Sequence, residues 1–187
     1  MDIAIRKTRS NRFLFEVKKM KILIATDGSE FSHNALAKAA DIAEGKKDVS
    51  FLVMSVYEPQ VPVAAEPFAV SPKFMQQLDE IAEARAQESV NEAKGFLRQR
   101  FTNLSIKIDG KVAMGRPAQL IVEMAESWEA DLIVAGSHGH GFWGRLAVGS
   151  VSDSILHHAP CSVLIVRPFK NAPVSLKLAA TVLTNVN

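Results

Sequence analysis

Short apolar runs alternate along the chain with longer segments in which apolar residues recur every three or four positions. The short runs are rich in Val, Ile and Leu and are bounded by polar, Gly or Pro residues, a pattern that is typical of buried strands. The predicted strands cover residues 21–26, 49–56, 105–112, 131–135 and 161–166. Residues 105–112 alternate apolar and polar positions, so we expect that strand near an edge of the sheet.

The longer segments predict amphipathic helices over residues 31–44, 73–100 and 117–128, and a last helix that begins at Ser150 and ends before Pro160. The helix over residues 73–100 carries one apolar stripe, which predicts its buried face. The residues of that stripe are Phe74, Leu78, Ile81, Ala86, Val90, Ala93 and Leu97.

Residues with strong positional preferences mark where these helices begin and end. Ser29 or Ser32 can cap the first helix, and Gly45 ends it. Pro117 suits the first turn of the third helix. Ser150 is predicted to cap the last helix through its hydroxyl.

The alternation of strands and helices predicts an α/β fold with a mainly parallel sheet and helices on both of its faces. The segment 58–72 holds four prolines and therefore predicts a loop. We expect one domain over residues 20–169, preceded by an N-terminal extension (1–19) and followed by a C-terminal tail (170–187). In such folds, ligands bind beyond the carboxyl ends of the strands, where the strand order reverses.

Composition is that of a soluble globular protein, with 187 residues of which 48% are hydrophobic and 22% charged. Cys161 is the single cysteine, which excludes a disulfide framework and favours a reducing, cytoplasmic location. The apolar runs are all shorter than the roughly 18 residues that would span a membrane. The N-terminus also lacks the apolar stretch of a secretory signal, so we expect no membrane association.

The net charge of +2 is unevenly distributed. Residues 1–21 hold seven Lys and Arg against two Asp and Glu, so the rest of the chain is mildly acidic. An acidic body argues against a nucleic-acid surface. The basic leader is interpreted as a disordered or start-site extension, because Met20 directly precedes the first strand, or as a segment that contacts an acidic partner.

Two loops that follow strands carry the candidate chemistry, ATDGSE after the first strand and AGSHGHGFWGRLAVGS after the fourth. In the second loop, Gly136 lets a ligand lie against bare backbone, and Gly139 permits a left-handed turn. Gly149 and Ser150 lead into a helix N-terminus, where free N–H groups favour an anion, and Ser150 and Ser152 add hydroxyl donors. The loop therefore predicts a phosphate cradle without a lysine. A purely structural glycine-rich turn is the alternative.

The spacing Gly136-x2-Gly139-x9-Gly149-Ser150 resembles the nucleotide-binding motif of the universal stress protein family, in its ATP-binding branch. The flanking stretches DLIVAGSHG and HHAPCSVLIVRP resemble the family as well. So do KILIATDGSEFS and GRPA, and the resemblance extends over residues 20–169.

This resemblance implies a five-stranded parallel sheet in the order 3-2-1-4-5, of the adenine-nucleotide alpha-hydrolase type, with ATP and Mg²⁺ or Mn²⁺ bound between strands one and four. It places adenine near Ala25 and Val56, Asp27 beside the ribose and the metal-bound phosphates, and Gly136 against the ribose. The implied nucleotide-binding residues are Ala25, Thr26, Asp27, Val56, Ala135, Gly136, Ser137, His138, Gly139, Arg145, Gly149, Ser150, Val151 and Ser152.

Some of these residues have alternative interpretations. Asp27 also suits a turn or a helix start. His138 either supports the loop or lies near a phosphate, and the pair His138 and His140 lacks a third ligand for a transition metal. Arg145 either contacts a phosphate or solvates the loop.

We expect slow hydrolysis or none, since the loops offer no evident general base, no signature lysine and no acceptor site. The resemblance implies a nucleotide-dependent stress-response or signalling switch, with an unidentified protein partner and a homodimer formed through Ser162–Val166. A weak ATPase or autophosphorylating enzyme, a cyclic-AMP-binding protein and a nucleotide-free scaffold remain as alternatives.

Overall fold

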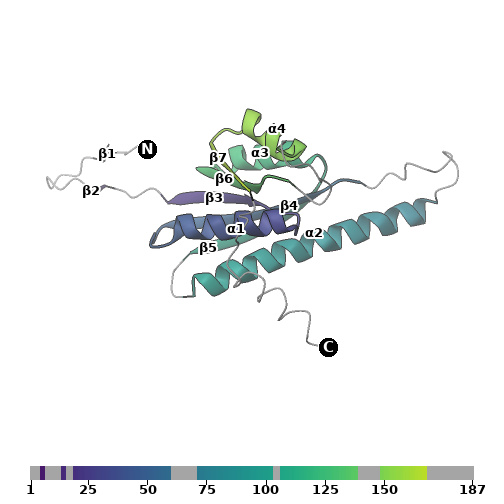
Figure 1. Cartoon of the computed structure of the whole chain (residues 1–187), viewed down its shortest axis with the longest axis horizontal. Coiled ribbons are helices and arrows are strands. Elements are labelled where there is room, and N and C mark those ends of the chain that lie inside the picture. The colour runs from purple at the N-terminus through teal and green to yellow at the C-terminus, as the bar shows by residue number, and fades with distance from the viewer. Residues whose placement is uncertain are drawn as a thin grey trace.

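A five-stranded parallel sheet forms the centre of the molecule (Figure 1). The computed structural model describes residues 5–6, 14–15, 19–59, 71–102, 106–138 and 148–167. The strands of the sheet are β3 (Met20–Ala25), β4 (Val49–Tyr57), β5 (Lys107–Met114), β6 (Leu132–Gly136) and β7 (Ser162–Val166). Their order, β5-β4-β3-β6-β7, is the order 3-2-1-4-5 when the strands of this sheet are numbered along the chain, which confirms the expected fold.

Helices cover both faces of the sheet. The helices α1 (Glu30–Ala43) and α2 (Pro72–Arg100) pack on one face, and α3 (Pro117–Ser127) and α4 (Ser150–His158) pack on the other (Figure 1). Successive residues of β3 point to opposite faces, so Ile22 and Ile24 join the α1–α2 core while Leu23 joins the α3–α4 core. Burial on both faces explains why the strands are continuously apolar.

Three of the predicted helix ends are confirmed. The Ser29 side chain caps α1 by accepting a hydrogen bond from the backbone N–H of Ser32, Gly45 follows α1 with a φ of 75°, and Pro117 opens α3. The predicted cap of α4 is wrong, because Gly149 occupies the N-cap position and Ser150 is the first helical residue. No side chain among the described residues caps α4.

The predicted buried face of α2 is correct only for its C-terminal half. Ala86 and Leu97 are buried, whereas Phe74 is 48% exposed and Ile81 52% exposed. A helix of 29 residues extends about 43 Å, and the nine-residue strand β4 extends about 30 Å. The first turns of α2 therefore run past the end of the sheet (Figure 1).

Strand β5 lies at an edge of the sheet, as expected, but it extends over Lys107–Met114 and not over residues 105–112. Ser105 lies outside the described residues. The sequence pattern did not predict β1 (Ile5–Arg6) and β2 (Leu14–Phe15), which pair antiparallel in the N-terminal extension. Within the described part of the chain, no helix combines the length and the apolar character that a bilayer crossing requires.

Candidate functional site

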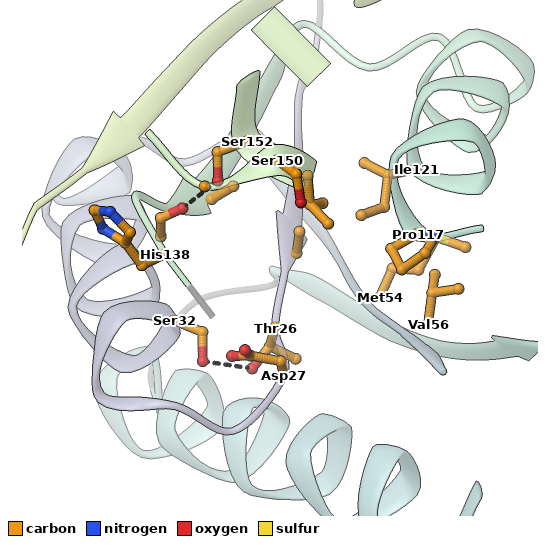
Figure 2. Close-up of a pocket in the computed structure, with 15 residues that line it drawn as sticks. Thr26, Asp27, Ser32, Met54, Val56, Pro117, Ile121, His138, Ser150 and Ser152 are labelled. Atoms are coloured by element: carbon orange, nitrogen blue, oxygen red, sulfur yellow. Dashed lines mark hydrogen bonds between the residues drawn. The ribbon is translucent and has the colours of Figure 1, made fainter. Parts of the chain in front are cut away.

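A cavity of about 410 Å³ opens at the carboxyl ends of β3, β4 and β6 (Figure 2). This volume falls in the range that is usual for small-molecule sites. The chain leaves β3 toward one edge of the sheet and leaves β6 toward the other, so the two loops diverge at the reversal point. The residues that line the cavity are Ala25, Thr26, Asp27, Ser32, Met54, Val56, Pro117, Ile121, Ala135, Gly136, His138, Gly149, Ser150, Val151 and Ser152.

One wall of the cavity is apolar. Met54 and Val56 from β4 lie beside Pro117 and Ile121 from the first turns of α3 (Figure 2). Met54 is 1% exposed and Ile121 is 3% exposed, so the packed core itself forms this wall. A rigid apolar surface of this kind suits a flat aromatic ring.

The backbone N–H and C=O groups of Val56 lie at the edge of that wall. Pairing between β3 and β4 ends at Ala25 and Met54, and Thr26 N–H donates the next bond to the Met54 carbonyl at 2.9 Å. Because backbone groups alternate between the two neighbouring strands, those of Val56 point to the side on which β3 has ended. Among the described residues, no backbone bond reaches Val56 from that side.

Tyr57 follows Val56 at the end of β4. Burial raises the pKa of the Tyr57 phenol, and the carboxylate of Glu83 on α2 raises it further through its charge and a hydrogen bond. The charge of Asp79 raises the Tyr57 pKa as well. The phenol therefore stays neutral at physiological pH.

The loop after β3 is a tight turn built around Asp27. Its carboxylate accepts a hydrogen bond from the Ser29 N–H at 3.0 Å, and Gly28 between them has a φ of 77°. Thr26 donates from its hydroxyl to the Ser32 hydroxyl at 3.2 Å, which fixes the turn against α1 (Figure 2). Asp27 thus has the turn role that its local sequence suggests, and it also lines the cavity.

Gly136 ends β6 against the first turn of α1. A Cβ atom built on Gly136 would lie 2.7 Å from the carbonyl carbon of Phe31 and 2.8 Å from the Phe31 oxygen. The missing side chain is therefore required for helix–strand packing, a role that the sequence did not reveal. Gly136 also lines the cavity, as predicted.

The N-terminus of α4 forms the polar side of the cavity. Gly149 N–H donates to the Ser137 carbonyl at 2.8 Å, and the first helical bond runs from Asp153 N–H to the Gly149 carbonyl at 2.8 Å. The N–H groups of Ser150, Val151 and Ser152 precede that first bond and thus have no helical acceptor. Together with the helix dipole, they favour an anion at this place.

His138 packs beside the cavity. Its ring lies 5.3 Å from that of Phe31, centroid to centroid, and its Nδ1 lies 3.0 Å from the Ser137 hydroxyl. These contacts favour the interpretation that His138 supports the loop. The described residues contain no group of three His, Cys, Asp or Glu side chains that could hold a metal ion by themselves. His140 lies outside the described residues.

The structure brings most of the predicted site residues together. Ser137 is buried and does not line the cavity, and Gly139 and Arg145 lie outside the described residues. The sequence analysis missed four residues that line the cavity, namely Ser32, Met54, Pro117 and Ile121. Pro117 directly follows a strand and a glycine turn, which is a signal that could have identified it.

Comparison with known proteins gives consistent sequence matches. A model of the universal stress protein family matches residues 19–167. The chain is similar to a universal stress protein of Synechocystis sp., with 32% identity over 79% of this chain and 97% of that protein. It is 35% identical to a universal stress protein of Thermus aquaticus, over 78% of this chain and 97% of that protein.

Solved structures share the fold. Universal stress protein UspA from Lactobacillus plantarum superposes with a TM-score of 0.65 at 25% identity, covering 79% of this chain and 97% of that one. A family protein from Arabidopsis thaliana with AMP bound gives 0.58 at 18% identity, covering 84% and 98%. A universal stress protein in complex with cAMP gives 0.55 at 22% identity, covering 80% and 97%.

Proposed function

This chain belongs to the universal stress protein family, and we propose that it binds an adenine nucleotide, ATP with a divalent metal ion, in the cavity between β3 and β6. One observation carries the proposal: a single cavity joins an apolar wall to a helix N-terminus with free N–H groups. A nucleotide has the same division between an apolar base and anionic phosphates. The structures of relatives with AMP and with cAMP support a ligand of this class.

The apolar wall is the proposed site of the base. Met54, Val56 and Ile121 would contact the faces of the ring, and the backbone N–H and C=O groups of Val56 would contact its edge. These two groups belong to successive peptide bonds, and in a strand they present one donor and one acceptor on the same side. Adenine presents a ring nitrogen that accepts beside an amino group that donates, which matches this pair. Guanine presents a donor and an acceptor in the opposite order and would place like against like.

The first turn of α4 is the proposed site of the phosphates. The cavity-lining residues that the structure describes include no Lys or Arg, so backbone N–H groups would carry most of the anion binding. Asp27 would repel phosphates unless a cation lies between them. Carboxylate and phosphate oxygens are ligands that Mg²⁺ and Mn²⁺ prefer, so Asp27 and the nucleotide would hold the ion together. When bound, the ion neutralises phosphate charge.

We propose a nucleotide-dependent stress-response or signalling switch with slow hydrolysis or none. Phosphoryl transfer to water needs an oriented nucleophile and strong charge stabilisation. Of the described residues that line the cavity, Asp27 and His138 are the ones with a carboxylate or imidazole side chain, and both are engaged in turn or loop contacts. Weak ATPase activity is the alternative that a phosphate-release assay would detect.

Identification of the bound nucleotide tests the proposal. The purified protein is denatured, and its released ligand is identified by absorbance and mass spectrometry. Stripped protein is then titrated with ATP, AMP, cAMP and GTP, each with and without Mg²⁺, with thermal shift as a second readout. We expect ATP with Mg²⁺ to bind most tightly and GTP to bind at least tenfold more weakly. Absence of binding and of any thermal shift for every adenine nucleotide would refute the proposal and leave a nucleotide-free scaffold.

We also propose a homodimer that forms through β7. This strand ends the described sheet, and Val163, Leu164 and Ile165 along it are half-buried. The backbone groups along such an edge strand are a template for pairing with a second chain. Sedimentation equilibrium would show a dimer for the wild type and a monomer for Val163→Lys, whereas an unchanged mass would contradict the assignment. We also propose that the dimer binds a protein partner, which sedimentation of the purified chain does not identify.

A further inference from the structure

Ser152 lies in the first turn of α4, yet its hydroxyl is directed into the protein. The side chain is buried, and its hydroxyl donates a hydrogen bond to the Gly136 carbonyl at 2.6 Å. A serine hydroxyl has one hydrogen, and in this structure Gly136 receives it. Only the backbone N–H of Ser152 remains for an anion.

The acceptor of that bond is firmly placed. Gly136 packs against the Phe31 backbone so closely that a Cβ atom would lie 2.7 Å from the Phe31 carbonyl carbon. The next residue, Ser137, donates its N–H to the Val166 carbonyl at 2.8 Å. The end of β6 is thus held from α1 on one side and from β7 on the other, which makes it an anchor for whatever binds to it.

Two bonds tie α4 to this anchor, and they come from opposite ends of its first turn. Gly149 N–H donates to the Ser137 carbonyl at 2.8 Å, and Ser152 donates to the Gly136 carbonyl. The packing of Val151 and Ile155 holds the body of α4, and the two bonds fix its first turn at both ends. The N–H groups of Ser150 and Val151, two residues that line the cavity, therefore keep a fixed direction.

We propose that Ser152 is a positioning residue for the nucleotide phosphates. Its hydroxyl fixes the first turn of α4 against β6, so that the backbone donors are aligned before the ligand arrives. Donors aligned in advance bind more tightly because no ordering cost accompanies binding. The proposal rests on the proposed function, but it assigns Ser152 a role through α4 and not through contact with the ligand.

The first experiment compares ATP with adenosine as ligands of Ser152→Ala. We expect the affinity for ATP to fall about tenfold, since one buried hydrogen bond is lost and the phosphate donors are less well aligned. The affinity for adenosine should stay within about twofold, because the apolar wall and Val56 are untouched. Ser50→Ala is the matched control: Ser50 is 6% exposed in β4, at the opposite end of the sheet, and its replacement should change neither affinity.

The second experiment separates positioning from direct contact by measuring amide hydrogen exchange in nucleotide-free protein. The amides of Gly149 and Asp153 are the relevant probes, because both donate hydrogen bonds at the start of α4. We expect Ser152→Ala to accelerate their exchange at least tenfold, and Ser152→Thr, which keeps a hydroxyl, to restore both slow exchange and ATP affinity.

Each outcome distinguishes the two roles. A loss of ATP affinity with unchanged exchange in the free protein would identify the hydroxyl as a direct phosphate contact and overturn the positioning role. Unchanged ATP affinity in Ser152→Ala would overturn it as well. Failure of the wild type to bind any adenine nucleotide overturns the proposed function itself. Titration of the wild-type protein alone detects that failure, so the two outcomes are distinguishable.

Discussion

Replacement of Gly149 by aspartate should abolish nucleotide binding while the fold remains intact. Gly149 is the N-cap residue of α4, with φ −61° and ψ 152°, which any L-residue can adopt. Aspartate is among the best N-cap residues, because its carboxylate accepts hydrogen bonds from the first N–H groups of the helix. In Gly149→Asp the protein would therefore supply its own anion at the place proposed for the phosphates.

The magnitudes follow from the surroundings of Gly149. A Cβ atom there would lie 3.2 Å from the Ser137 carbonyl oxygen and 3.3 Å from the His138 Cα, which is tight but not prohibitive. Because glycine is itself a tolerated N-cap residue, a new side-chain cap adds only about a few tenths of a kcal/mol to stability, which offsets part of this crowding. Two like charges about 4 to 5 Å apart repel by about 3 to 4 kcal/mol at an effective dielectric constant of 20. ATP should therefore bind more than a hundredfold more weakly.

Gly149→Asn is the control that isolates the charge. Asparagine has the shape of aspartate and also caps helices, so it introduces the same crowding and the same competition for N–H groups. ATP titrations of the two variants by calorimetry, at low and at high salt, measure the difference between them. We expect Gly149→Asn to weaken ATP binding by about tenfold and Gly149→Asp to weaken it much further. The difference in ATP affinity between the two variants should decrease as the salt concentration rises. Equal ATP affinities for the two variants, with thermal unfolding unchanged, would refute the placement of phosphates at α4.

Three further predictions concern the fold and the site. Gly136→Ala should lower the free energy of unfolding by about 1 to 3 kcal/mol in urea titrations, because its Cβ would meet backbone atoms. Gly95→Ala on α2 has open space around the new Cβ and should raise the free energy of unfolding by about 0.5 to 1 kcal/mol. Asp27→Asn keeps the turn acceptor but not the charge, so it should remove the Mg²⁺-dependent part of ATP affinity and leave the affinity in EDTA unchanged or higher. Tyr57 is the single tyrosine, so absorbance titration at alkaline pH should show one midpoint above the ordinary value of about 10. The midpoint should be lower in Glu83→Gln, and an unchanged midpoint in that variant would contradict the effect of Glu83 on the Tyr57 pKa.

The sign of the tyrosine effect on stability follows from the direction of the shift. A raised pKa means that folded Tyr57 keeps its proton at a pH where the unfolded chain has begun to lose it. The folded state then binds more protons, so stability falls as pH rises above the unfolded value. We expect this loss in alkaline solution, above about pH 10, whereas at neutral pH the contribution of Tyr57 is fully present and does not change with pH.

The sequence alone determined the order of the strands and helices of the main sheet and the two loop segments that contribute to the cavity. Both are local properties: a short apolar run predicts a strand, and a proline or a capping residue marks a helix start. Gly149 and Ser150 indicated the proposed anion site, because a glycine-to-helix junction needs no distant partner to expose its N–H groups. The strand order came from a family resemblance, since periodicity carries no information on which strands are neighbours.

Tertiary structure decided the features that depend on residues far apart in the chain. Gly136 has to be glycine because the Phe31 backbone in the first turn of α1 packs directly against it, whereas its motif position alone suggested a ligand. Met54 and Ile121 line the cavity because α3 packs beside β4. The exposure of Phe74 follows from how far α2 outruns the sheet. Side-chain periodicity tells which residues share a face, but packing decides what that face meets, and packing is set by the whole chain.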